Sequence, residues 1–243
     1  MKKQLAMVSL LSVAAVSMFA TSADATVIKE AKTDVGIQFK SDEGTVGEDG
    51  PFKDNLALVF RPGSFKFGNQ EAVVGNATFN SIKPEKKQYL VVNDDRTEAT
   101  TPAWTLSANM SALVSGAGTE AVDLDGATLT YTLGDAKSYA IGEFSEEKND
   151  YIPVNPSDDA SVLGTLAAGN DIVLGNGTSK TVSLTAASAS KTAILAKSKA
   201  NAVKGGVATE ITNVKLMVPD KGKKIAGKAF TGTVTWSLDD LAK

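Results

Sequence analysis

The chain has 243 residues, contains neither cysteine nor histidine, and carries a formal net charge of −3 at pH 7. Disulfides, Cys-His dyads, histidine triads and ordinary zinc sites are therefore excluded, and so small a net charge gives no support for nucleic-acid binding. The length is sufficient for one large all-β domain or two small ones. We expect no metal site and no cofactor.

The first 25 residues have the organisation of a secretory signal peptide. Lys2 and Lys3 supply a positively charged start, an apolar run extends from Leu5 to Ala20, and Ala23-Asp24-Ala25 fits the small-x-small cleavage pattern. A membrane-spanning helix is the alternative, but the run is short for a bilayer. No later apolar run is long enough to cross one, so we assign residues 1–25 to the signal peptide and expect no transmembrane segment in the mature chain.

The rest of the chain reads as short strands separated by Gly, Pro, Asn and Asp. Apolar and polar residues alternate in most of these runs, as in half-buried strands, and the spacing is typical of an all-β antiparallel sandwich or barrel with long surface loops. The strand runs are Val35–Phe39, Leu56–Phe60, Phe65–Phe67, Tyr89–Val92, Trp104–Leu106, Leu129–Leu133, Ile172–Leu174, Thr181–Leu184, Val214–Val218 and Phe230–Leu238.

Three regions depart from this pattern. Residues 143–169 are polar and contain two prolines, which predicts a long excursion over the surface. Residues 175–177, Gly-Asn-Gly, separate two short strands and predict a hairpin between them. Ser188–Val203 is rich in Ala and Lys and is followed by Gly205-Gly206, which is compatible with one short helix.

Trp104 and Trp236 are the only tryptophans, and each belongs to a Trp-x-Leu sequence that ends at Leu106 or Leu238. Because side chains alternate across a strand, each Trp shares a face with its Leu. That face is either part of the core or, if exposed, a platform for sugars or a protein partner. Alternating strands ordinarily bury their apolar face, so we favour the core for at least one Trp.

No persuasive catalytic site is present. The adjacent carboxylates Glu146-Glu147 and Asp158-Asp159 point apart, whereas glycosidases need two facing carboxyl groups. Ser188 and Lys191 match a Ser-x-x-Lys spacing, but the partner motifs of that chemistry are missing. We therefore expect a non-enzymatic protein without catalytic residues.

Three charged regions admit two interpretations each. The acidic loop at residues 41–54 clusters carboxylates that suit calcium, but it lacks EF-hand spacing, so a solvated loop is favoured. Asp123–Gly126 resembles a fragment of a calcium loop without its later ligands, and a turn is favoured there. The lysine-rich segment from Lys191 to Lys228 suits anionic wall polymers or an acidic partner, although a solvated set of lysines is the interpretation we favour.

The order of several segments resembles the WxL domain of Gram-positive surface proteins, and the likeness extends over nearly all of residues 26–243. The two Trp-x-Leu elements carry most of it. Phe65–Gly68 stands where the family commonly has Asp-Phe-Gly, with Lys66 in place of the acidic residue. The other similar segments are the apolar strand and acidic-Arg turn at Tyr89–Arg96, Pro102–Leu106, Ala127–Leu129, Val214–Pro219 and Gly232–Leu238.

The resemblance implies an exported protein held on the cell wall without covalent attachment. It implies binding to peptidoglycan and to a membrane-anchored WxL-interacting protein, in a surface complex that can include other WxL proteins. Residues 26–243 would form the WxL domain, and its motif residues would be structural or ligand-facing: Trp104, Leu106, Trp236 and Leu238. A host- or substrate-binding adhesin is the alternative function, and a wall-active enzyme is a third.

Overall fold

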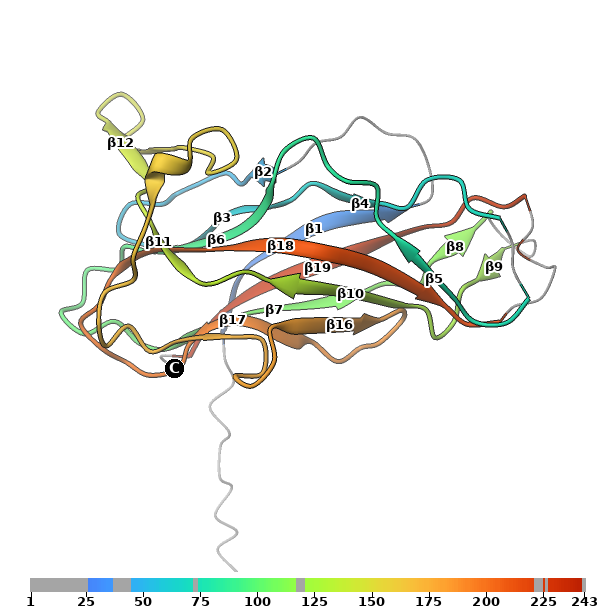
Figure 1. The fold of residues 1–243 in the computed structure, drawn as a ribbon. Helices are drawn as coiled ribbons and strands as arrows, with labels where there is room; N and C mark the ends of the chain where they lie inside the picture. Colours follow the sequence, from blue (N-terminus) through green and yellow to red (C-terminus); the bar gives the residue numbers. More distant parts are fainter. Residues whose placement is uncertain are drawn as a thin grey trace, which may run out of the picture.

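The computed structural model describes residues 26–36, 45–71, 74–116, 121–220, 225 and 227–241. The expected signal peptide and residues 37–39 of the expected first strand lie outside these ranges. Two large sheets pack against each other as an elongated sandwich (Figure 1). Neither sheet closes on itself within the described residues, so the sandwich prediction is confirmed and the barrel alternative is not.

The first sheet holds both Trp-x-Leu strands in its centre. Its pairings are antiparallel, except that β1 and β4 run parallel. In spatial order its strands are β15 (Ile172–Leu174), β17 (Thr192–Lys197), β7 (Trp104–Met110), β19 (Thr231–Asp240), β1 (Thr26–Gly36) and β4 (Ser64–Lys66), and β8 (Val114–Ser115) with β9 (Val122–Asp123) extends one end.

The second sheet is organised around β18, the longest strand (Gly205–Val218), which has neighbours along both edges. Its main path is β14 (Leu163–Gly164), β11 (Lys137–Tyr139), β18, β6 (Gln88–Asp94), β3 (Leu56–Pro62) and β2 (Thr45–Gly47). Beyond this path β18 also pairs with β5 (Ala77–Asn80) and with β10 (Thr128–Leu133), which in turn pairs with β16 (Thr181–Thr185).

The main core lies between the two sheets. Alternate residues of the central strands meet there, as the period of two predicts. The aromatic members link the layers: Trp236 of the first sheet lies 6.4 Å from Tyr131 of the second, centroid to centroid, and Tyr131 stacks on Phe65 at 6.0 Å.

A second, smaller core covers the outer face of the second sheet. Ala57 and Val59 of β3 and Tyr89 and Val91 of β6 point into it, so these strands are buried on both faces. The cover comes from residues 139–163, which include much of the surface excursion predicted at 143–169. This segment is therefore a packed cap; it contains β12 (Gly142–Ser145), β13 (Asp150–Pro153) and the 3₁₀ helix η2 (Ala160–Val162).

The predicted helix at residues 188–203 is wrong. The segment forms β17 instead, paired with β7 and β15. A bulge between Ala193 and Leu195 lets the consecutive residues Ile194 and Leu195 both reach the main core. Burial between two strands here overrides the helix preference of Ala and Lys, which is worth less than 1 kcal/mol per residue.

The predicted hairpin around residues 175–177 is also wrong. β15, which precedes the turn, pairs with β17 in the first sheet, whereas β16, which follows it, pairs with β10 in the second. The turn therefore carries the chain from one layer to the other. The side-chain oxygen of Asn176 accepts hydrogen bonds from the backbone N–H groups of Thr178 and Ser179, at 3.1 and 2.8 Å, which fixes this crossing.

Candidate functional site

The two Trp-x-Leu motifs lie on neighbouring antiparallel strands, β7 and β19. Leu106 and Leu238 are direct partners across the ladder, and Trp104 and Trp236 lie on opposite sides of this Leu pair along it. All four side chains have at most 1 % of their surface exposed. The motifs therefore build one continuous patch of core, and Trp104 also lines a small pocket of about 150 Å³ at the edge of this patch.

Trp236 is tied into the core by a hydrogen bond as well as by packing. Its indole N–H donates to the hydroxyl of Thr33 on β1 at 2.7 Å, and this hydroxyl donates to the carbonyl of Pro62 at 2.5 Å. A buried indole N–H without a partner would destabilise the fold, so Thr33 satisfies a requirement that burial creates. These two hydrogen bonds link β19, β1 and the end of β3.

Tyr131 lacks such a partner: within the described residues its buried hydroxyl makes no hydrogen bond. We expect Tyr131→Phe to leave the free energy of unfolding unchanged or to raise it by about 1 kcal/mol, because it removes an unsatisfied buried group. Chemical unfolding at neutral pH measures this. A loss of more than about 1 kcal/mol would show that the hydroxyl is bonded.

Tyr131 also predicts how stability depends on pH. Burial raises the pKa of its hydroxyl far above the ordinary value, so the folded protein keeps a proton that the unfolded chain releases near pH 10. The stability linked to protonated Tyr131 is thus fully present below pH 10 and is lost as the pH rises further. In urea titrations between pH 8 and pH 11, the free energy of unfolding should fall less for Tyr131→Phe than for the wild type. An equal fall in the two proteins would contradict this.

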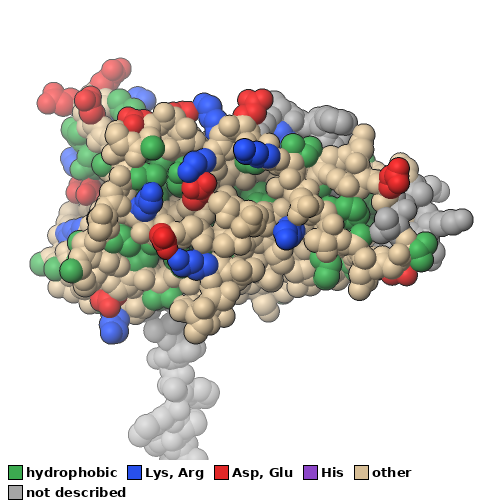
Figure 2. All heavy atoms as spheres, viewed as in Figure 1, with side chains coloured by type: hydrophobic (Ala, Val, Ile, Leu, Met, Phe, Trp, Pro, Cys, Tyr) green, Lys and Arg blue, Asp and Glu red, His purple; other side chains and the backbone are tan. Residues whose placement is uncertain are grey.

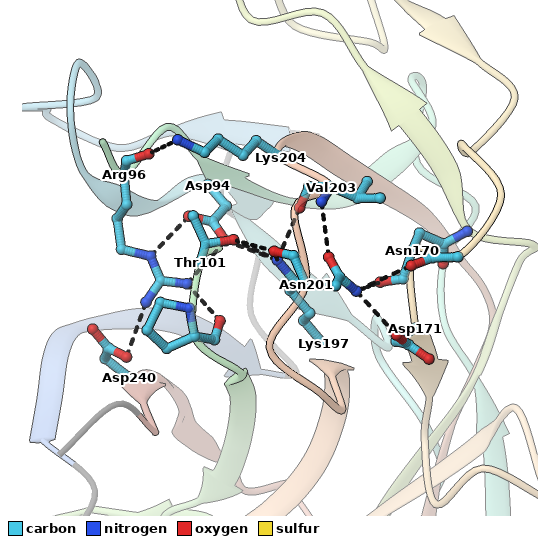
Figure 3. Close-up of polar contacts among 12 residues, drawn as sticks. Asp94, Arg96, Thr101, Asn170, Asp171, Lys197, Asn201, Val203, Lys204 and Asp240 are labelled. Atoms are coloured by element: carbon cyan, nitrogen blue, oxygen red, sulfur yellow. Dashed lines mark hydrogen bonds and ion pairs between the residues drawn. The ribbon is translucent and has the colours of Figure 1, made fainter. Parts of the chain in front are cut away.

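A buried ionic cluster closes one end of the sandwich beside the motifs (Figure 3). Arg96 binds both carboxylate oxygens of Asp94, the last residue of β6, at 2.8 and 2.9 Å. It also donates to Asp240, the last residue of β19, and to the carbonyl of Pro102, at 2.9 and 2.8 Å. One guanidinium therefore joins the ends of the two sheets.

The charge of Arg96 is well supported in this position. Burial opposes the charged form, but the hydrogen bonds and charges of Asp94 and Asp240 outweigh it and raise the pKa of Arg96 above its ordinary value. A bidentate guanidinium–carboxylate pair is also the strongest geometry that such a contact takes. The cluster therefore acts as a fixed clamp between the sheets.

Lys197 of β17 belongs to the same cluster. Its ammonium group donates to the Thr101 hydroxyl, and to the carbonyls of Asn201 and Val203 at 3.2 and 2.8 Å, and it lies 3.8 Å from Asp94. Burial lowers its pKa, and the charge of Asp94 offsets part of this effect. The three N–H donors of Lys197 are thus all used inside the protein, so this buried side chain is not available to bind a polymer.

The lysine-rich segment therefore does not form a single face among its described residues. Lys197 is buried, Lys204 donates to the carbonyl of Arg96 at 2.6 Å, and Lys191 lies 3.8 Å from Glu30. Lys215 is exposed on β18. Lysines 221, 223 and 224 lie outside the described residues.

The other charged candidates have structural contacts. Glu48 of the acidic loop lies 2.5 Å from Arg61 and 3.5 Å from Lys29, and Asp158 pairs with Lys86 at 2.6 Å. The carboxylate of Asp159 caps η2. In the described part of the chain no group of three or more acidic residues is arranged to hold a metal ion.

A groove on the outer face of the second sheet is the candidate binding site. β18 pairs with β6 up to Ile211 and with β5 from Lys215 onward. The chain between those two neighbours, residues 81–87, loops outward and encloses a groove of about 610 Å³ against β18. Asn213 has a φ of +52° at this point, where the strand changes partners.

The walls of the groove combine apolar surface with four lysines and two glutamates, Glu85 and Glu210. Lys and Arg side chains lie among Asp and Glu side chains over this face in Figure 2. Lys87 pairs with Glu210 at 3.0 Å. Lys86 pairs with Asp158 at 2.6 Å. The remaining polar wall residues supply amide, hydroxyl and ammonium groups that suit a ligand with carboxylates and hydroxyls; they include Asn80, Lys83, Thr212, Asn213 and Lys215.

The chain matches the family model described as "WxL domain surface cell wall-binding" over residues 27–241. The chain belongs to the WxL domain family. This is a family of wall-binding domains and not of enzymes, so the protein has a surface, cell-wall-binding role. No curated protein and no solved structure gives a significant match. Among its described helices, this WxL domain has none long and apolar enough to cross a membrane.

Sequence reasoning found the motif residues of the WxL domain but missed the clamp and the groove. The Asp94–Arg96 turn was visible, yet its partner Asp240 lies 144 residues further along the chain from Arg96. The groove depends on a change of strand partners, for which the sequence holds one weak signal: Asn213, a residue type that tolerates a positive φ.

Proposed function

We propose that this WxL domain is a non-enzymatic subunit of a cell-wall surface complex that binds peptidoglycan through the groove between residues 81–87 and β18. Residues 1–25 serve as the signal peptide, and residues 26–243 are the exported part. The Trp-x-Leu strands act structurally: they form the rigid core on which the outer sheet and its groove are mounted. The same complex includes a membrane-anchored WxL-interacting protein, and other WxL proteins can join it.

The observation that carries this proposal is the chemistry of the groove. Peptidoglycan offers sugar hydroxyls, amides and the free carboxylates of its peptides. The lysines supply charge for the carboxylates, and the Asn and Thr side chains supply donors and acceptors for the neutral groups. The burial of Trp104 and Trp236 supports a surface of this kind and disfavours direct stacking of sugars on the motifs.

The alternative function, adhesion to a host or substrate, would be supported by an exposed aromatic cluster away from the Trp-x-Leu strands. Phe144 is the single strongly exposed aromatic side chain of the described residues. One phenylalanine is a small platform for an adhesive contact. We therefore keep wall association as the main function.

The double variant K83E/K215E tests the groove. Reversing two charges in its wall should weaken binding to purified peptidoglycan about tenfold or more, which corresponds to about 1.4 kcal/mol. The affinity of the wild type should also fall with salt, because exposed charges are screened. Sedimentation with purified sacculi at two ionic strengths measures both effects.

The matched control is K137E/K199E, which reverses two exposed lysines outside the groove. It has the same net charge as K83E/K215E, so a loss confined to the groove variant identifies the site. Equal binding by the two variants would refute the groove as the site, and a loss of native fluorescence in either would identify misfolding.

A further inference from the structure

A hairpin separate from both large sheets projects from the cap. β12 and β13 pair only with each other among the described strands, and Figure 1 shows β12 at the outer edge of the molecule. An isolated two-stranded hairpin is at best marginally stable in water. Contacts between this hairpin and the rest of the chain therefore decide whether it keeps its shape.

Asp150, which pairs with Ser145 next to the turn at residues 146–149, ties the turn end of the hairpin to residues 52 and 53. Its carboxylate accepts hydrogen bonds from the backbone N–H groups of Phe52, Lys53 and Tyr151, at 3.0, 2.8 and 2.8 Å. Burial opposes its charge, but these three donors outweigh burial and lower the pKa of Asp150. The hydroxyl of Tyr139 also donates to the carbonyl of Val154, just past β13, at 2.9 Å. The hairpin is thus pre-organised.

Each face of the hairpin exposes a large apolar side chain. Phe144 pairs across the ladder with Tyr151 on one face, and Ile152 pairs with Glu143 on the other. Phe144 is 42 % exposed and Ile152 is 48 % exposed. Exposed apolar groups on two opposite faces suit insertion between two walls better than contact with a flat surface.

The tip of the hairpin is acidic. Glu146 and Glu147 are exposed in the turn beside Lys148, Glu143 is exposed on β12, and red side chains gather at this end of the molecule in Figure 2. Phe144 already contacts a cationic group of this protein. The ammonium group of Lys53 lies 5.1 Å from the centre of the Phe144 ring, a cation–π contact, and 3.3 Å from the side-chain oxygen of Asn149.

We propose that the β12–β13 hairpin is a docking element that inserts into a cleft of another protein of the same envelope. The cleft has apolar walls for Phe144 and Ile152, and lysine or arginine side chains that face Glu143, Glu146 and Glu147. The acidic tip disfavours anionic wall polymers, so the ligand is a protein. The inference rests on the proposed function only in placing both proteins on one cell surface.

The binding test uses the natural producer strain after deletion of the gene for this protein. It compares two preparations from that strain: untreated envelopes, and sacculi stripped by detergent and trypsin. The wild type should bind both, with an additional class of sites on the untreated envelopes. The variants F144S/I152S and E146K/E147K should lose that additional class about tenfold or more and keep their binding to stripped sacculi. V74S, which alters a side chain that is 84 % exposed elsewhere, should bind like the wild type.

The outcomes separate this inference from the proposed function. Loss of sacculus binding in K83E/K215E alone concerns the groove, whereas loss of the trypsin-sensitive class in the hairpin variants alone concerns the hairpin. If trypsin removes no binding sites, or if the hairpin variants keep them, the docking proposal is wrong. All variants replace exposed side chains, so little effect on folding is expected.

Cross-linking identifies the type of partner. A photoreactive benzoyl-phenylalanine at position 144 should attach, on untreated envelopes, to a peptide of another protein in which apolar residues adjoin Lys or Arg. The same group at position 74 should not attach there. Attachment to glycan, or to a second copy of this chain, would overturn the proposal.

Discussion

Trp236→Ala is expected to lower the free energy of unfolding by about 3–5 kcal/mol, the range for deleting a large buried aromatic side chain. The ring is fully buried between the sheets and adjoins Tyr131. Truncation would open a cavity at the centre of the sandwich and leave the hydroxyl of Thr33 without its donor. Unfolding in guanidinium chloride, followed by circular dichroism, measures the loss.

Two controls accompany this variant. Val74→Ala shortens a side chain that is 84 % exposed and should change the free energy of unfolding by less than about 0.5 kcal/mol. Trp236→Phe keeps part of the ring and should be less destabilising than the alanine variant. If Trp236→Ala were as stable as the wild type and instead lost affinity for peptidoglycan, the motif would be a binding site and not a core element.

The second large effect is expected at the clamp. Arg96→Met should lower the free energy of unfolding by about 3–5 kcal/mol, because it leaves the carboxylate of Asp94 buried without its bidentate partner. The side chains of Asp94 and Arg96 are only 3 % and 8 % exposed, so water cannot replace the lost contact easily. Lys197, 3.8 Å from Asp94, would compensate only in part.

The matched control is Lys180→Met. Lys180 also pairs with an aspartate, Asp135, but these side chains are 50 % and 84 % exposed. Pairs so accessible to water typically contribute less than about 1 kcal/mol. A double-mutant cycle of Arg96→Met with Asp94→Asn should show strong coupling, since both changes remove one interaction. Additive losses would mean that the two residues act separately and that no clamp exists.

Much of the fold follows from local pattern. The alternation in β7, β10 and β19 predicts strands with one buried face, and those strands carry the Trp, Leu and Tyr side chains of the main core. This inference works because burial on one face imposes a period of two on the sequence. It identifies a strand and its inner face, but not its neighbour.

Strand pairing accounts for the predictions that are wrong. Nothing local to residues 172–184 indicates that β15 and β16 belong to different sheets, because a Gly-Asn-Gly turn serves a hairpin and a crossing equally well. The segment at 192–197 reads as helix by composition, and only its place between β15 and β7 makes it a strand. Such contacts are non-local, so propensity carries no information about them.

The candidate site shows the same division. The Trp-x-Leu residues stand out in the sequence, and their register, with Leu106 opposite Leu238, explains why one motif accompanies the other. The groove is formed by residues from β5, the loop 81–87 and β18, which meet only after the sheet is built. Lys83 and Lys215 line the same groove only because the strand topology brings them together.

Tryptophan fluorescence of the mature protein, with iodide quenching in the presence and absence of purified peptidoglycan, tests the central claim most directly. Trp104 and Trp236 are the only two tryptophans, and both are buried. We expect a blue-shifted emission that iodide does not quench and that peptidoglycan leaves unchanged, even when sedimentation shows binding. A red-shifted, quenchable emission that becomes protected when peptidoglycan is added would contradict this expectation and place a Trp-x-Leu motif in the binding site.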